Sequence, residues 1–97
     1  GVYRDDPLDD EVELREVLGD AAVDRLGAAD AGQRRPPMET ALDVLRVLQG
    51  WVDDASAARW FATRQRRLDD RTPIEVLVTG GDEEVEDAAR AWAAAQG

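Results

Sequence analysis

The feature that most constrains the fold of this chain is a short segment in which a helix start and a helix stop lie only a few residues apart. At its start, the Thr72 hydroxyl can accept from the backbone N–H of Glu75, whose carboxylate can reach back to the threonine N–H. Pro73 occupies the first helical position, where its missing N–H costs nothing. Two glycines that begin at Gly80 supply the left-handed backbone that ends a helix. The sequence therefore predicts a helix over residues 73–79.

Residue propensity alone offers a second interpretation of this segment, because Val76, Leu77 and Val78 could form a short strand. The capping residues and the closing glycines outweigh that preference. Elsewhere in the chain apolar residues recur with the period of a helix. We therefore predict an all-α fold, a small bundle of about six short helices without a sheet.

Helix starts and stops also divide the first part of the chain. Asp9 or Asp10 can cap a first helix. Asp20 can cap a second helix, which Gly27 would end. Residues 28–37 have no apolar period and contain two adjacent arginines and two adjacent prolines, which predicts a loop or hinge.

The clearest helical period follows Thr40, which we expect to cap a helix with Asp43 at the capping-box position. Asp54 can cap a further helix, and Asp82 can cap a last one whose first turns are acidic. The apolar stripes of the first and last of these three helices are Leu42, Leu45, Leu48 and Val52, and Val85, Ala88, Ala89 and Trp92.

Large aromatic side chains are few, so they are the main candidates for the centre of a core. We expect Trp51, Trp60 and Phe61 to pack on one another. Trp92 is the expected exception, because it lies close to the C-terminal end. The other apolar residues include much alanine, and so thin a core favours stabilisation by a partner or by homodimerisation.

The composition excludes most catalytic and metal chemistry. The chain has neither Cys nor His, so it lacks thiolate ligands, disulfides, and the commonest general base and metal ligand. Adjacent acidic pairs fall mostly at predicted helix caps, and no glycine-rich phosphate loop is present. We therefore predict a protein that is not an enzyme, with no catalytic residue, metal site or cofactor. No apolar run could span a membrane and no signal-peptide pattern is found, which predicts a soluble cytoplasmic protein.

The net charge of −10 is unevenly spread along the chain. Residues 1–30 carry three arginines and ten acids, and residues 72–97 carry one arginine and six acids, so both segments are acidic. Such a field repels a phosphate backbone and attracts a basic protein. The middle of the chain holds a basic cluster that includes Arg64 and Arg67. This cluster can serve as surface ion pairs or as a protein contact, and it has too few interleaved aromatics for a nucleic-acid patch.

Four short patterns occur in a fixed order: Ala57–Phe61, Arg71–Leu77, Thr79–Gly81 and Glu84–Asp87. Taken together they resemble the toxin-binding domain of the Xre/MbcA/ParS family of bacterial antitoxins. The resemblance covers roughly residues 41–97. The chain departs from the family in the loop after Phe61, which is rich in arginine where the family usually has Asn, Pro and glycine.

The resemblance implies a division of the chain into two parts within one compact domain. Residues 41–97 would form the toxin-binding helical region. Many members of the family carry a helix-turn-helix at the N-terminal side. Residues 1–40 would correspond to it as a helical segment with a hinge, and because this segment is acidic we expect its DNA-reading function to be degenerate or absent.

The same resemblance implies a function. The chain would be the antitoxin of a bacterial type II toxin–antitoxin system, which binds and blocks the active site of a RES-type, NAD-consuming toxin with its C-terminal end. The corresponding positions here are Arg90, Trp92, Ala93, Ala94, Ala95, Gln96 and Gly97, to which we add Arg64 and Arg67 as partner contacts. Two alternatives are a DNA-binding transcriptional regulator and a helical dimerisation module of a larger protein.

Overall fold

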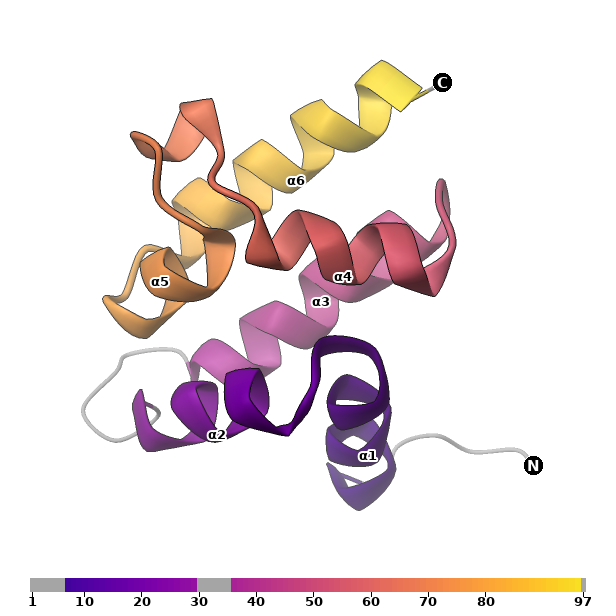
Figure 1. Cartoon of the computed structure of the whole chain (residues 1–97), viewed down its shortest axis with the longest axis vertical. Coiled ribbons are helices and arrows are strands. Elements are labelled where there is room, and N and C mark those ends of the chain that lie inside the picture. The colour runs from indigo at the N-terminus through magenta and orange to yellow at the C-terminus, as the bar shows by residue number, and fades with distance from the viewer. Residues whose placement is uncertain (1–6, 30–35, 97) are drawn as a thin grey trace.

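A computed structural model of the chain describes residues 7–29 and 36–96, and this part folds as a bundle of helices (Figure 1). The elements in order are α1 (Pro7–Leu18), α2 (Asp20–Ala29), α3 (Pro37–Gln49), α4 (Asp54–Ala62), the 3₁₀ helix η1 (Arg66–Leu68), α5 (Pro73–Val78) and α6 (Asp82–Gln96). Over the described residues the only β-type pairing is an isolated bridge between Gln65 and Arg71. The predicted all-α fold of about six helices is confirmed for these residues. None of the described helices is long and apolar enough to cross a membrane.

The helices surround one hydrophobic core to which all six α-helices and η1 contribute. α6 packs most extensively against α3, and α4 and α5 also pack against each other, whereas α1 and α2 lie at the opposite end of the molecule from the end of α6 (Figure 1). The largest side chains that are fully buried in this core are Leu14, Val23, Leu26, Val44, Leu45, Leu48, Phe61, Leu68, Val76, Leu77 and Val85.

The helix start at Thr72 and the stop at Gly80 form as the sequence predicts. The Glu75 N–H donates to Thr72 Oγ1 and the Thr72 N–H donates to Glu75 Oε1, both at 3.2 Å. Pro73 is the first residue of α5, and Gly80 has a φ of 90°. Gly81 differs from the prediction, because it is not left-handed. Its N–H donates to the Val76 carbonyl at 2.9 Å, so a small residue is needed for the chain to return this closely over α5.

Thr40 and Asp43 do not cap α3, and the prediction for both was wrong. The helix begins one turn earlier at Pro37, and the N–H groups of Glu39 and Thr40 donate to the Pro36 carbonyl. A proline is well suited to a helix start, so no side-chain cap is needed here. Thr40 is instead fully buried inside the bundle, and its hydroxyl has no hydrogen-bond partner among the described residues.

The other predicted caps are displaced by a residue or more. Asp53, rather than Asp54, caps α4, because the Ser56 N–H donates to Asp53 Oδ1 at 2.8 Å. α6 begins at Asp82 itself, and the Val85 N–H donates to the carbonyl of the preceding glycine. α1 begins at Pro7, which places both candidate caps, Asp9 and Asp10, inside its first turns, and α2 begins at Asp20.

The predictions for Gly27 and for the loop over residues 28–37 need correction. Gly27 does not end α2, which continues to Ala29. A Cβ at this position would lie 3.2 Å from Met38 Cε, so the glycine lets α3 approach α2 closely. Most of the predicted loop over 28–37 lies outside the described residues, although its first two residues and Pro37 are helical.

Trp51 does not join the aromatic core, contrary to the prediction. α3 ends at Gln49, and the N–H groups of Trp51 and Val52 both donate to the Leu48 carbonyl at 2.9 Å. This turn carries the Trp51 side chain outward, where it is 55% exposed. The core therefore has fewer large aromatic side chains than the sequence indicates.

Replacing Thr40 with Val tests the cost of its unpaired hydroxyl. The substitution keeps the shape of the side chain and removes a buried polar group, so we expect the free energy of unfolding to rise by about 1 kcal/mol. Urea denaturation followed by circular dichroism measures the change. Thr63→Val is the control, because the Thr63 hydroxyl donates to the Arg59 carbonyl at 2.6 Å and its loss should not stabilise the protein. A destabilised Thr40→Val protein would contradict this account.

Replacing Gly81 with Ala tests the close return of the chain over α5. The new Cβ would lie 2.4 Å from Val76 Cγ1, so we expect a loss of about 1–3 kcal/mol in the free energy of unfolding. In a Val76→Ala background the same substitution should cost at least about 0.5 kcal/mol less, because the clashing methyl group is gone. Gly19→Ala is the control: Gly19 has a φ of 94° and open space around it, so its cost should not depend on Val76. If the Val76→Ala background reduced the cost of Gly81→Ala and of Gly19→Ala equally, the contact between Gly81 and Val76 would be refuted.

Candidate functional site

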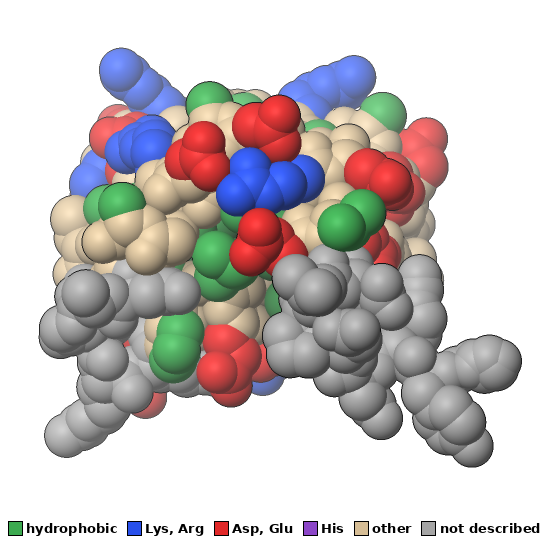
Figure 2. All heavy atoms as spheres, turned by 90° about the horizontal axis from the view of Figure 1, so that it is seen from below, with side chains coloured by type: hydrophobic (Ala, Val, Ile, Leu, Met, Phe, Trp, Pro, Cys, Tyr) green, Lys and Arg blue, Asp and Glu red, His purple; other side chains and the backbone are tan. Residues whose placement is uncertain are grey.

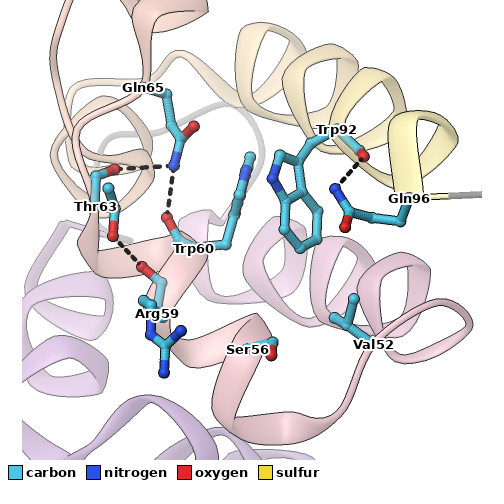
Figure 3. Close-up of a pocket in the computed structure, with 8 residues that line it drawn as sticks. All are labelled: Val52, Ser56, Arg59, Trp60, Thr63, Gln65, Trp92 and Gln96. Carbon is cyan, nitrogen blue, oxygen red and sulfur yellow. Dashed lines mark hydrogen bonds between the residues drawn. The ribbon is translucent and has the colours of Figure 1, made fainter.

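The C-terminal half of α6 borders two neighbouring hollows that share Gln65 and Trp92. The first has a volume of about 280 Å³ and lies between α4 and α6 (Figure 3). The second has a volume of about 260 Å³ and lies between η1 and α6. We call the two together the α6 groove. It is lined by Val52, Ser56, Arg59, Trp60, Thr63, Gln65, Arg66, Arg67, Ala88, Ala91, Trp92, Ala95 and Gln96.

Two indole rings join α4 to α6 along this groove. The ring centroids of Trp60 and Trp92 lie 6.3 Å apart, and Figure 3 shows the two rings side by side between the helices. Trp60 also meets Phe61 edge-on at 5.4 Å. Trp60 is only 3% exposed, and its indole N–H has no hydrogen-bond partner among the described residues. Trp92 packs partly buried against this core, so the predicted packing of Trp60 and Phe61 is confirmed and Trp92 remains open to the groove.

Hydrogen bonds hold the polar wall of the groove in place. Gln65 Nε2 donates to the carbonyls of Trp60 and Thr63, both at 3.1 Å (Figure 3). On the other side, Gln96 Nε2 donates to the Trp92 carbonyl at 3.2 Å. These bonds tie the groove side chains to the ends of α4 and α6, which limits how far the wall can move when a partner binds.

A tight turn positions η1 beside α6. Leu68, the apolar residue of η1, is buried in the core. Asp69 and Asp70 both adopt positive φ, and the Asp70 N–H closes the turn on the Gln65 carbonyl at 3.0 Å. Arg71 links the turn to α6 through an ion pair with Glu84 at 3.7 Å. The basic loop is therefore anchored at both ends while its arginines remain exposed.

The structure brings together some of the predicted contact residues and separates others. Trp92, Ala95, Gln96 and Arg67 all line the groove. Arg90 faces α3 instead and pairs with Asp87 at 3.6 Å. Ala93 is 2% exposed and belongs to the buried face of α6, whereas Ala94 and Arg64 are exposed and do not line the groove. Gly97 lies outside the described residues.

Several groove residues were missed by sequence reasoning. Arg59 and Gln65 reach the groove only because α4 and the turn after it pack beside α6. Ala88, Ala91 and Ala95 could have been found, because their spacing places them on one face of a helix next to Trp92. From the sequence, the small size of these alanines indicated only that the helix packs closely on its neighbours. The structure shows that this face also borders a surface hollow.

The ionisable groups with clearly lowered pKa values belong to helix caps rather than to the groove. The pKa of Asp53 is lowered, first of all by the backbone hydrogen bond from Ser56. The pKa of Glu75 is lowered chiefly by the backbone hydrogen bond from Thr72. Among the described residues, no group of three or more acidic side chains is placed to hold a metal ion.

Residues 47–90 match the family model of the antitoxin Xre/MbcA/ParS C-terminal toxin-binding domain. This segment, a little under half of the chain, is similar to the toxin-binding domain of these antitoxins. The resemblance drawn from the sequence is thus confirmed over these residues, which run from the end of α3 into α6. No curated protein and no solved structure matches the chain. The toxin-binding domain implies a toxin as the partner, and the α6 groove lies mostly within the matched residues.

The cap at the start of α5 makes the stability of the toxin-binding domain depend on pH. The pKa of Glu75 is lower in the folded state, so its stabilising effect is complete above its unfolded pKa and is lost as the pH falls through its folded pKa. Glu75→Gln keeps an acceptor oxygen without a titrating group, so the Tm should fall less between neutral pH and about pH 3. Thermal denaturation measures the Tm at each pH. Glu83→Gln on α6 is the control, and an equal reduction of the fall in Tm in both variants would contradict the prediction.

Proposed function

We propose that this chain is the antitoxin of a type II toxin–antitoxin system and that the end of α6 covers the active-site entrance of its toxin. The toxin would be of RES type and consume NAD in the bacterial cytoplasm. The antitoxin would act by binding alone, since the sequence has neither the Cys nor the His on which most nucleophilic and acid–base catalysis depends. The family match supports the class of partner.

The observation that carries the proposal is the position of the α6 groove. The end of α6 lies at the extremity of the molecule opposite α1 and α2 (Figure 1). There Ala94, Ala95 and Gln96 are exposed, and Trp92 offers a partly buried ring that is already fixed against Trp60. A rigid aromatic anchor surrounded by small side chains can enter a concave surface with little loss of conformational entropy.

The face formed by α1 and α2 gives no comparable support for DNA binding. Viewed from below, the acidic and arginine side chains of this face are interspersed (Figure 2). Arg15 illustrates the mixture, because it forms ion pairs with Glu11, Asp20 and Asp24 at 3.0–3.2 Å. The hydrogen bonds that Arg15 donates, first of all the one to Asp24, raise the pKa of Arg15. An arginine held by three acids is poorly placed to neutralise phosphates, so the toxin-blocking function is favoured.

Co-expression with the protein encoded by the neighbouring gene tests the proposal. We expect the neighbour to deplete cellular NAD when it is produced alone, and the full chain to restore NAD and to co-purify with it. Continued NAD loss without complex formation would contradict the proposed antitoxin function. A neighbour that is a DNA-binding or unrelated protein would also count against it.

A bulky substitution at the end of α6 tests where the toxin binds. Ala95→Tyr should weaken toxin binding at least about tenfold, equivalent to roughly 1.4 kcal/mol, because the new ring fills the groove. Isothermal titration calorimetry measures the affinity, and circular dichroism checks the fold. Ala21→Tyr is the matched control, since Ala21 is exposed on α2 away from the groove. If the two variants bound the toxin with equal affinity, the toxin would not bind at the end of α6.

A further inference from the structure

The α6 groove has a charge opposite to that of the chain. The sequence contains 22 acidic residues and a net charge of −10. None of the residues that line the groove is acidic, and three of them are arginines: Arg59, Arg66 and Arg67. The charge of the groove lining is therefore positive, opposite in sign to the net charge of the chain.

Two of the groove arginines, Arg66 and Arg67, form no ion pair within the described residues. Arg15, Arg46 and Arg71 form ion pairs with acids of the chain. Arg59 interacts electrostatically with Asp53. Arg66 and Arg67 are exposed and have no acidic partner of this kind among the described residues. Their guanidinium groups are therefore free to form bidentate hydrogen bonds with carboxylates of another molecule.

The remaining groove residues complement these charges with apolar and amide surface. Ala88, Ala91 and Ala95 lie beside the Trp92 ring, and the amide of Gln65 is fixed at the junction of the two hollows. Trp and Arg together are the side chains most enriched at energetic centres of protein interfaces. The two hollows are open to the surface and together border α6 from Ala88 to Gln96, which suits a protein segment.

We propose that the α6 groove receives an acidic segment of the partner toxin. Carboxylates of that segment pair with Arg66 and Arg67, and a neighbouring apolar side chain packs on Trp92. The identity of the partner as a toxin rests on the proposed function, whereas the chemistry of the segment rests on the groove. The arginine-rich loop, which departs from the usual loop of the family, thereby becomes a determinant of which toxin is bound.

Peptide display on the isolated full-length chain tests this chemistry without the toxin. A library of random dodecapeptides on phage is selected for binding, and the enriched sequences are compared with the unselected library. We expect Asp and Glu to be enriched next to an aromatic or large aliphatic residue. Binding of a selected peptide should weaken as the salt concentration rises, because its carboxylates pair with exposed arginines. Failure to select any binder, or enrichment without acidic residues, would overturn the proposal.

Charge reversal locates the effect in the groove. Arg67→Glu should weaken the selected peptides at least about tenfold, and Arg25→Glu, an exposed arginine on α2, should change affinity by less than about twofold. Both variants change the net charge by the same amount, so a difference between their peptide affinities must come from the position of the substituted residue. Equal losses would overturn the proposal.

The same two variants separate this proposal from the proposed function. If the neighbouring toxin binds the Arg67→Glu chain as well as the unmodified one, the groove proposal fails and the antitoxin function stands. If acidic peptides bind the groove but no toxin does, the antitoxin function fails and the groove chemistry stands.

Discussion

The close packing of α6 on the bundle is the contact on which the rest of the structure depends. The buried face of α6 consists of Val85 and small residues such as Ala89 and Ala93. Small side chains let a helix approach its neighbours closely, and the large Trp60 ring fills the remaining space from α4. α6 contributes Val85, Ala88 and Ala89 to the core and packs most extensively against α3. This packing also leaves the Trp92 ring at the edge, half inside the core and half in the groove.

This arrangement connects stability with binding. The same indole pair that joins α4 to α6 forms the wall of the surface that we propose for the toxin. The capping box of Thr72 and Glu75 starts α5, and the return over Val76 directs the chain into α6. The segment around α5 is therefore a scaffold that sets the direction of α6, and the contact surface lies on α6 and on the arginine-rich loop.

Predictions from the sequence were correct where a feature depends on neighbouring residues, and wrong where it depends on contacts between distant parts of the chain. The start of α5 was predicted correctly because its four residues satisfy one another's backbone groups whatever surrounds them. Thr40 has the same local chemistry as Thr72, yet it lies buried within α3, because Pro37 starts the helix earlier and the bundle covers the threonine. Gly27 was expected to stop a helix, but α2 continues past it and the glycine lies close to the Met38 side chain of α3. Trp51 was assigned to the core by its size, and the turn at the end of α3 placed it outside.

By itself, the sequence determined the helical class, the α5 cap and the family of residues 47–90, since these depend on short patterns along the chain. It also determined that His and Cys chemistry is absent. Only the tertiary structure decided which contact candidates share a surface. Trp92, Ala95 and Arg67 meet there with Arg59 and Gln65, whereas Ala93 is buried and Arg90 faces α3. The physical reason is that a groove forms between elements distant in sequence, and its position depends on how closely α6 can pack.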